Sequence, residues 1–299
     1  MKKIDPRILK NTFKALGFIL PFLLVYSVFT VWPIIQGMYV SLHRWGLMGR
    51  IRFVGLANYR NFLVDRHFWD ALFNTTRFVL LAVPGVIIAA LVLALLANRP
   101  SGLKKLFRVC FYMPAVLSVS VISFMAVFLY SPHTGFVISL LHTFRIVPQD
   151  VQIMFLTRIP WIWYVIVSIT VWWTTGFSMM LYISAMQDIP ETVYEAAELD
   201  GASKARQLFR ITLPLLKPTT YLILLLQIIA SYRVFGQIFM ISRGGPGTAT
   251  RPLIQYIYES AFRNNDMGYA AAMSYALFLI LVVLSLIQLK YQKYKDQTS

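Results

Sequence analysis

The chain has 299 residues, of which 58% are hydrophobic and only 13% are charged. Because soluble domains carry about 25% charged residues, this composition excludes an ordinary soluble protein and indicates a membrane protein. The formal net charge of +16 does not indicate a nucleic-acid partner, since the basic residues lie between long apolar runs rather than on one polar domain.

The sequence lacks the common catalytic and nucleotide-binding patterns. Cys110 is the single cysteine, so an intramolecular disulfide and a thiolate metal cage are both impossible. The four histidines are scattered, and no metalloprotease, nucleophile-elbow or phosphate-loop motif occurs. We therefore predict no catalytic residue, no metal site and no cofactor here; if the protein uses ATP, a different chain binds the ATP and its magnesium.

The amino-terminal segment 1–14 is basic and precedes an apolar run, as in a secretory signal peptide. The run is uncharged from Ala15 to His43, however, which is much longer than the apolar region of a signal peptide. We predict that it is retained as a first membrane span.

Apolar runs long enough to cross a bilayer recur along the chain. A helix needs about 20 apolar residues to span roughly 30 Å of hydrocarbon. We predict an all-α, polytopic fold with a single membrane domain, 1–299, and six transmembrane helices. Their expected bounds are 14–40, 73–97, 109–130, 161–187, 218–241 and 268–290.

The distribution of lysine predicts the orientation. An even number of spans places both termini on one side, and with the termini inside, the inner segments hold every lysine of the chain. The inner loop 98–108 has four basic residues and no acidic one, which fits the positive-inside rule. Arg233 interrupts the fifth span; it is either functional or, as we favour, close enough to the outer interface to reach water.

The inner loop 188–217 differs from the rest because it holds five of the twelve acidic residues. Asp188 and Glu191 have the spacing of a capping box, with Pro190 in the first helical turn. Gly201 then predicts the end of this short helix, because a left-handed C-terminal turn suits glycine best.

A second, basic and amphipathic helix is expected over 202–212. Pro214 and Pro218 break the chain before the fifth span begins. The result is a polar helical elbow between two membrane helices. On local physics alone it is either a docking element that transmits a partner's motion or an amphipathic connector lying on lipid headgroups.

The loop also carries a sequence signature: E-A-A, three residues, G, nine residues, then I-x-L-P, from Glu195 to Pro214. This resembles the EAA loop of ABC importer permeases at every fixed position. The resemblance implies a type I importer fold in a bacterial inner membrane, and a coupling helix that docks in a cleft of a cytoplasmic ATPase. The residues that it assigns to ATPase coupling are Glu195, Ala196, Ala197, Asp200, Gly201 and Pro214.

Further matches extend the resemblance over nearly the whole chain. They are W-x-x-G-F at 173–177 before Q-x-I-P at 187–190, Phe235 before G-G-P at 244–246, and F-V-G-L-A-N-Y at 53–59. These segments resemble carbohydrate permeases of the maltose-permease-like branch, close to glycerol-phosphate and oligosaccharide permeases, without the extra helices and large outer domain of the maltose type. The resemblance implies a sugar substrate, a second related permease as heterodimer partner, two ATPase subunits and an outer solute-binding protein.

The solute pathway is expected among spans three to five. Sugars are bound by hydrogen bonds to their hydroxyls and by aromatic rings, and one group of residues offers both. The candidates are Trp172, Trp173, Thr174, Gly176, Gln227 and Ser231. Two alternatives stay open: tryptophans are common in interfacial belts, and Ser or Gln within a bundle often form interhelical hydrogen bonds.

The outer segments are basic through arginine alone. These residues are Arg44, Arg50, Arg52, Arg60, Arg66, Arg77, Arg145, Arg158, Arg243, Arg251 and Arg263. Arginine binds carboxylates bidentately, so these residues could dock an acidic solute-binding protein or attract an acidic saccharide such as a uronide. The third alternative is that they only contact water and lipid headgroups.

The sequence disfavours three other functions. An ion-coupled secondary transporter normally uses carboxylates at mid-membrane, and no Asp or Glu lies inside a predicted span. An intramembrane enzyme would need paired carboxylates, a metal cluster or a Ser–His set in the spans, and His133 and His142, in or beside the outer loop after the third span, have no such partners. A permease for other solutes, such as amino acids, metals or anions, is disfavoured by the G-G-P and W-x-x-G-F elements, while glycerol-phosphate-type solutes and uronides remain alternatives.

Overall fold

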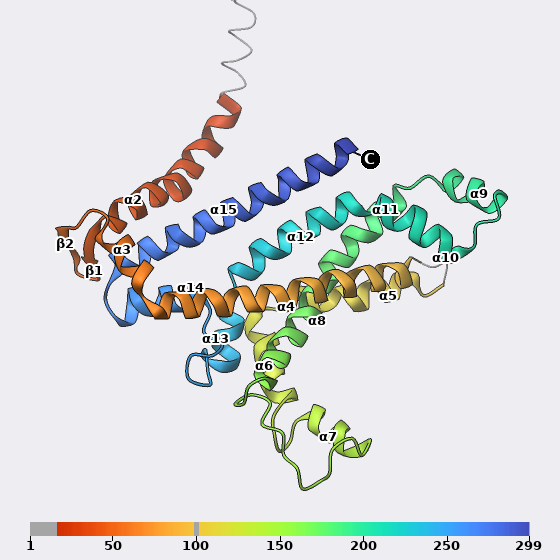
Figure 1. Ribbon diagram of the computed structural model, residues 1–299, viewed down its shortest axis with the longest axis horizontal. Coiled ribbons are helices and arrows are strands. Elements are labelled where there is room, and N and C mark those ends of the chain that lie inside the picture. The colour runs from red at the N-terminus through yellow and green to blue at the C-terminus, as the bar shows by residue number, and fades with distance from the viewer. Residues whose placement is uncertain (1–16, 99–101, 299) are drawn as a thin grey trace, which may run out of the picture. The chain divides into compact units, whose positions relative to one another are not determined.

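The computed structural model describes residues 17–98 and 102–298, which are mainly helical (Figure 1). The predictions for segment 1–14 and for the start of the first span concern residues outside this part. The chain divides into two compact units: residues 1–65 with 257–277, and residues 66–256 with 278–299.

The first unit begins with an apolar helix, Gly17–Ser41, whose last part is α2 (Trp32–Ser41). A hairpin of two antiparallel strands follows directly, β1 (His43–Gly46) and β2 (Gly49–Phe53), and then α3 (Ala57–Val64). The short π-helical segment Glu259–Arg263 and the start of α15 (Met267–Thr298) complete the unit.

Polar and aromatic contacts hold the hairpin against the end of α2. The His43 ring lies 4.2 Å from the Tyr39 ring and 5.1 Å from the Phe53 ring, centroid to centroid. The buried Asn58 amide on α3 donates to the carbonyls of Ser41 and His43, at 2.8 and 3.0 Å. The amide thereby satisfies carbonyls that would otherwise be left unpaired where the helix ends.

The second unit is organised around α4 (Arg66–Ala97) and α8 (Trp161–Gln187), which pack against one another. Several of the α4 residues on the packed face are small: Ala82, Ala90 and Ala94 are fully buried. Small side chains allow membrane helices to approach closely, which explains why these two long helices are in contact.

Two hydrophobic clusters fill this unit. The first joins α4 and α8 to α6 (Val119–Leu129), α7 (Phe136–Thr143) and α13 (Gly236–Ser242). The second joins the last turns of α4 and α8 to α12 (Lys217–Tyr232). The helix α14 (Leu253–Tyr258) is linked to α4 by a 2.8 Å hydrogen bond from the Leu253 amide to the Thr75 hydroxyl.

Among the described residues, four helices are long and apolar enough to cross a membrane by length and composition: Gly17–Ser41, Arg66–Ala97, Trp161–Gln187 and Met267–Gln292. The number rises to six if each of two bent helix pairs counts as one span, Lys104–Val116 with Val119–Leu129 and Lys204–Leu215 with Lys217–Tyr232.

The segment predicted as one span over 109–130 is not a continuous helix. The helix α5 (Lys104–Tyr112) continues through a 3-10 turn to Val116 and meets α6 at an angle of 98°. Leu117 and Ser118 are extended, and the Ser118 hydroxyl caps α6 by accepting from the Val121 amide. Such a side-chain cap starts a new helix rather than continuing the old one.

The segment predicted over 218–241 is broken as well. Helix α12 ends at Tyr232, Arg233 forms its C-cap, and α13 begins only at Gly236. The side-chain amide of Gln237 donates to the hydroxyl of Thr170 on α8, at 2.5 Å, so a contact between residues far apart in the chain fixes where α13 lies.

Candidate functional site

The first helix of loop 188–217 is α9 (Glu191–Leu199), and its start differs from the prediction. Asp188 is the C-cap of α8, and Pro190 is the N-cap of α9 without a side-chain hydrogen bond. The predicted Asp188–Glu191 capping box is therefore wrong: Asp188 still belongs to the last turn of the preceding membrane helix, so its carboxylate does not cap α9.

The end of α9 confirms the predicted role of Gly201. This residue has a positive φ of 71°, and its amide donates to the Glu198 carbonyl at 3.0 Å. The next amide, that of Ala202, donates to the Ala197 carbonyl at 2.8 Å. These two bonds form a Schellman motif, which requires a left-handed residue at this position and is most easily made with glycine.

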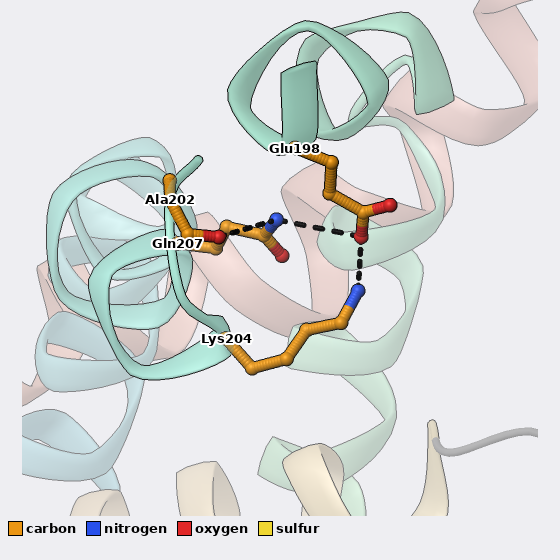
Figure 2. A network of polar contacts seen from close by, with 4 residues as sticks. All are labelled: Glu198, Ala202, Lys204 and Gln207. Carbon is orange, nitrogen blue, oxygen red and sulfur yellow. Dashed lines mark hydrogen bonds and ion pairs between the residues drawn. The ribbon is translucent and has the colours of Figure 1, made fainter. Parts of the chain in front are cut away.

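A polar network joins α9 to α10 (Lys204–Gln207), as Figure 2 shows. The Glu198 carboxylate pairs with Lys204 and accepts a 3.4 Å hydrogen bond from the Gln207 amide. Gln207, only 4% exposed, also donates to the Ala202 carbonyl at 3.5 Å. Hydrogen bonds from Lys204 and then Gln207, together with the lysine charge, lower the pKa of Glu198, so this carboxylate is ionised at neutral pH.

A second link connects α9 to the segment that leads into α12. The Tyr194 hydroxyl lies 2.9 Å from the Thr212 hydroxyl, which belongs to a π-helical segment, Leu208–Thr212. The expected helix over 202–212 is thus a short α-helix capped by Ser203 and followed by π-helical turns. Pro214 lies in the next short helix, α11 (Leu213–Leu215), just before the 58° bend into α12.

The candidate coupling residues lie on or beside an accessible helix. Glu195, Ala196, Asp200 and Gly201 are exposed, whereas Ala197 and Pro214 are half-buried. Sequence reasoning missed Leu199, whose side chain is 90% exposed. An apolar residue between Glu198 and Asp200 in a polar loop was the signal that could have revealed it.

A pocket of about 310 Å³ in the second unit brings together four of the six candidate solute residues. Trp173 and Thr174 come from α8, and Gln227 and Ser231 come from α12. Trp172 lies outside this lining and is 44% exposed.

Gly176, the last candidate, has a packing role. A Cβ atom on it would lie 2.4 Å from the Phe111 carbonyl oxygen and 2.8 Å from the Tyr112 Cα. Gly176 therefore lets the backbone of α5 approach α8, and it does not line the pocket.

Hydrogen bonds fix the polar side chains around the pocket. The Gln227 amide donates to the Ser178 hydroxyl at 3.0 Å, and the Trp173 indole donates to the Leu117 carbonyl at 3.1 Å, at the bend before α6. Trp173 thereby satisfies an otherwise unpaired backbone group and holds its ring at the pocket wall.

Sequence reasoning missed the segment between α12 and α13 as pocket lining. Arg233, Val234 and Phe235 all contribute, as does Gln237 in the first turn of α13, and no acidic residue lines the pocket. Arg233 had been expected near the outer interface; its position in a helix break beside the pocket gives the pocket a positive charge. Within the residues described, no group of histidine, cysteine or carboxylate side chains could hold a metal ion.

Long apolar helices, a polar elbow and a pocket beside broken helices are features of a multi-pass membrane transport protein. Comparison with known protein families shows which class of transport protein this is. Residues 63–295 match the family described as "Binding-protein-dependent transport system inner membrane component". The chain belongs to this family, which confirms the resemblance to ABC importer permeases.

Individual relatives agree with this assignment. The chain is 32% identical to the probable ABC transporter permease protein YurN of Bacillus subtilis, over 90% of this chain and 93% of the relative. It is 30% identical to the sulfoquinovosyl glycerol transport system permease protein SmoG of Agrobacterium fabrum, over 92% and 89%. A solved bacterial ABC transporter involved in the import of the acidic polysaccharide alginate matches with a TM-score of 0.84 and 23% identity, over 96% of this chain and 98% of that one. The structural likeness confirms the predicted type of fold.

Proposed function

We propose that this chain forms one half of the membrane pathway of an importer for a sugar or oligosaccharide. In this proposal, ATP hydrolysis in partner subunits drives transport through loop 188–217. A second related permease completes the pathway, two ATPase subunits dock on the inner side, and a solute-binding protein delivers the sugar outside. Both termini then lie in the cytoplasm of a bacterial cell, as the lysine distribution favours.

The observation that carries the coupling proposal is the double attachment of α9 to the segment before α12. The Glu198 network holds one end of α9, and the Tyr194–Thr212 bond holds the other. Because both links are side-chain contacts across short distances, a push on α9 reaches α12 and the pocket-lining residues on it. Leu199 supplies an apolar anchor that a partner groove would cover, as helix-in-groove recognition requires.

Site-directed cross-linking tests this arrangement. Cys110, which is exposed, is first replaced by serine, and Leu199→Cys is introduced in the assembled importer. We expect the new thiol to cross-link to the ATPase and to react only with reagents that reach the cytoplasm. Met48→Cys in the predicted outer hairpin is the control, and it should show the opposite accessibility. Labelling of Leu199→Cys from outside would contradict the proposed orientation.

The proposed sugar cargo is supported by the composition of the pocket. Its volume of about 310 Å³ lies at the lower end of the range for small-molecule sites, roughly 300–1,000 Å³. It offers an aromatic wall from Trp173 and polar groups from Thr174, Gln227 and Ser231. The relative SmoG is named for sulfoquinovosyl glycerol transport, which supports a carbohydrate-type solute for this chain.

An acidic saccharide is a second candidate cargo, and Arg233 favours it. A guanidinium that lines a pocket without any acidic residue would attract a carboxylate. The alginate importer that shares this fold carries an acidic polysaccharide. Uptake of neutral and uronic oligosaccharides by the reconstituted importer separates the two candidates, since entry of neutral sugars alone would exclude the acidic cargo.

A further inference from the structure

The hairpin β1–β2 has two faces of different chemistry. His43 pairs with Phe53 across the strands, and Arg44 pairs with Arg52. Side chains alternate along β1, so Arg44 lies on the face opposite to His43 and Trp45, and its partner Arg52 shares that face; the register shifts after this pair, so that Trp45 pairs with Arg50. The aromatic face rests on the last turn of α2: the rings of His43 and Trp45 lie 4.2 and 6.2 Å from the Tyr39 ring, centroid to centroid.

The arginine face carries two like charges directly opposite one another. Such a pair destabilises a hairpin, and both Arg44 and Arg52 are exposed. Neither guanidinium has an ion-pair partner among the residues that the structure describes. A repulsive pair that the chain leaves unneutralised breaks a local rule of sheet design, which is the behaviour expected of a binding surface.

Three of the other outer arginines make charge contacts within the chain. Arg66 pairs with Asp70, and Arg263 pairs with Glu259, each at 3.8 Å. The Arg77 guanidinium lies 5.1 Å from the centre of the Trp163 ring, a cation–π contact. The pair on the hairpin differs from these three because its two guanidinium groups lie opposite one another across paired strands.

The tip of the hairpin is apolar but held in place. Leu47 is 54% exposed and Met48 fully exposed, although the Leu47 amide donates to the Asn265 side chain at 2.5 Å. Gly46 also lies against Asn265, where a Cβ would come within 3.2 Å of the amide oxygen. A fixed tip with exposed methionine beside arginine has the composition of a protein interface, in which both residue types are enriched.

We propose that Arg44 and Arg52, with the tip residues Leu47 and Met48, bind a carboxylate-rich patch on the outer solute-binding protein. The inference deepens the proposed function and rests on it, because that function supplies the partner and the side of the membrane. The aromatic face packs on α2, so the arginine face turns away from this membrane helix and towards water rather than lipid. Each guanidinium matches a carboxylate bidentately, and a shared acidic patch relieves the repulsion between the two arginines.

The test uses the complete importer in phosphatidylcholine nanodiscs and its purified solute-binding protein. The variant is Arg44→Gln/Arg52→Gln, and the control is Arg60→Gln, which removes an exposed charge from α3 in the same unit. We expect the double variant to weaken binding by about tenfold or more at low salt, with a smaller difference at about 0.5 M salt because exposed charges are screened there. The control should bind as the unmodified importer does.

Thermal stability separates binding from a structural role. Since the two arginines repel one another, the double variant should unfold at the same or a higher temperature while it binds more weakly. A lower unfolding temperature together with weaker binding would indicate that the arginines merely hold the hairpin, and it would overturn the inference, as would unchanged binding.

Two further measurements distinguish lipid from the binding protein as the partner, and separate a failure of this inference from a failure of the proposed function. If the variant changes only the interaction with phosphatidylglycerol vesicles, the arginines bind lipid phosphate and the inference is wrong. If the binding protein stimulates ATP hydrolysis equally in the unmodified importer and in the double variant, this inference is wrong and the proposed function stands. If the binding protein does not stimulate ATP hydrolysis by the unmodified importer, the proposed function is wrong.

Discussion

Substitution of Gly201 tests whether the shape of loop 188–217 couples ATP hydrolysis to transport, as proposed above. Gly201 has a φ of 71°, and a Cβ added to it would meet nothing within 4 Å. The side chain therefore has room, and the cost of a substitution comes from the backbone conformation alone. A left-handed conformation costs an ordinary residue about 1–2 kcal/mol, and asparagine less.

A cost of about 1–2 kcal/mol changes the population of the native turn by a factor of roughly 5–30. The series Gly201→Asn, Gly201→Ala and Gly201→Val should therefore rank by backbone preference and not by volume. We expect the asparagine variant to transport almost normally, the alanine variant to lose several-fold in coupling, and the valine variant to be worst because a β-branched residue tolerates positive φ least.

The assay is the number of ATP molecules hydrolysed per solute imported by the importer in proteoliposomes, with the amount of assembled complex measured in parallel. The asparagine variant is the matched control, because its side chain reaches at least as far from the backbone as that of valine. If asparagine and valine raise the ratio equally, the partner senses volume at this position and the conformational reasoning is refuted. Normal coupling in the valine variant would refute the coupling role itself.

Three other outcomes follow from the structure. Gly176→Ala should destabilise the detergent-solubilised protein by about 1–3 kcal/mol because its Cβ would clash with the α5 backbone, whereas Gly102→Ala, at a site with free space, should leave the unfolding temperature unchanged. Gln227→Leu should shift solute preference, with roughly tenfold slower uptake of the preferred sugar and normal assembly; equal uptake across a sugar panel would remove Gln227 from the pathway. Because Lys204 lowers the pKa of Glu198, the contact between the Glu198 carboxylate and Lys204 is fully present above the ordinary carboxyl pKa and is lost as the pH falls through the lowered pKa. Hydrogen exchange of the loop amides should therefore become faster in acid, and Glu198→Gln should abolish this pH dependence.

Local signals were sufficient where the structure depends on neighbours in sequence. The left-handed turn at Gly201 follows from the intrinsic freedom of glycine, and the spacing from Glu195 to Pro214 identified the family before any fold was known. The capping box at Asp188 was predicted wrongly from the same kind of signal, because the end of α8 extends into the loop and takes Asp188 into its own last turn.

The sequence by itself determined which segments are apolar, the polar loop 188–217 and the family, because hydropathy and turn chemistry are properties of short segments. Only the tertiary structure decided that Trp173, Gln227 and Arg233 line one pocket, that Gly176 accommodates a crossing backbone, and that two arginines oppose each other on the hairpin. These arrangements depend on where helices bend and how strands register, and those choices are made by contacts between residues far apart in the chain.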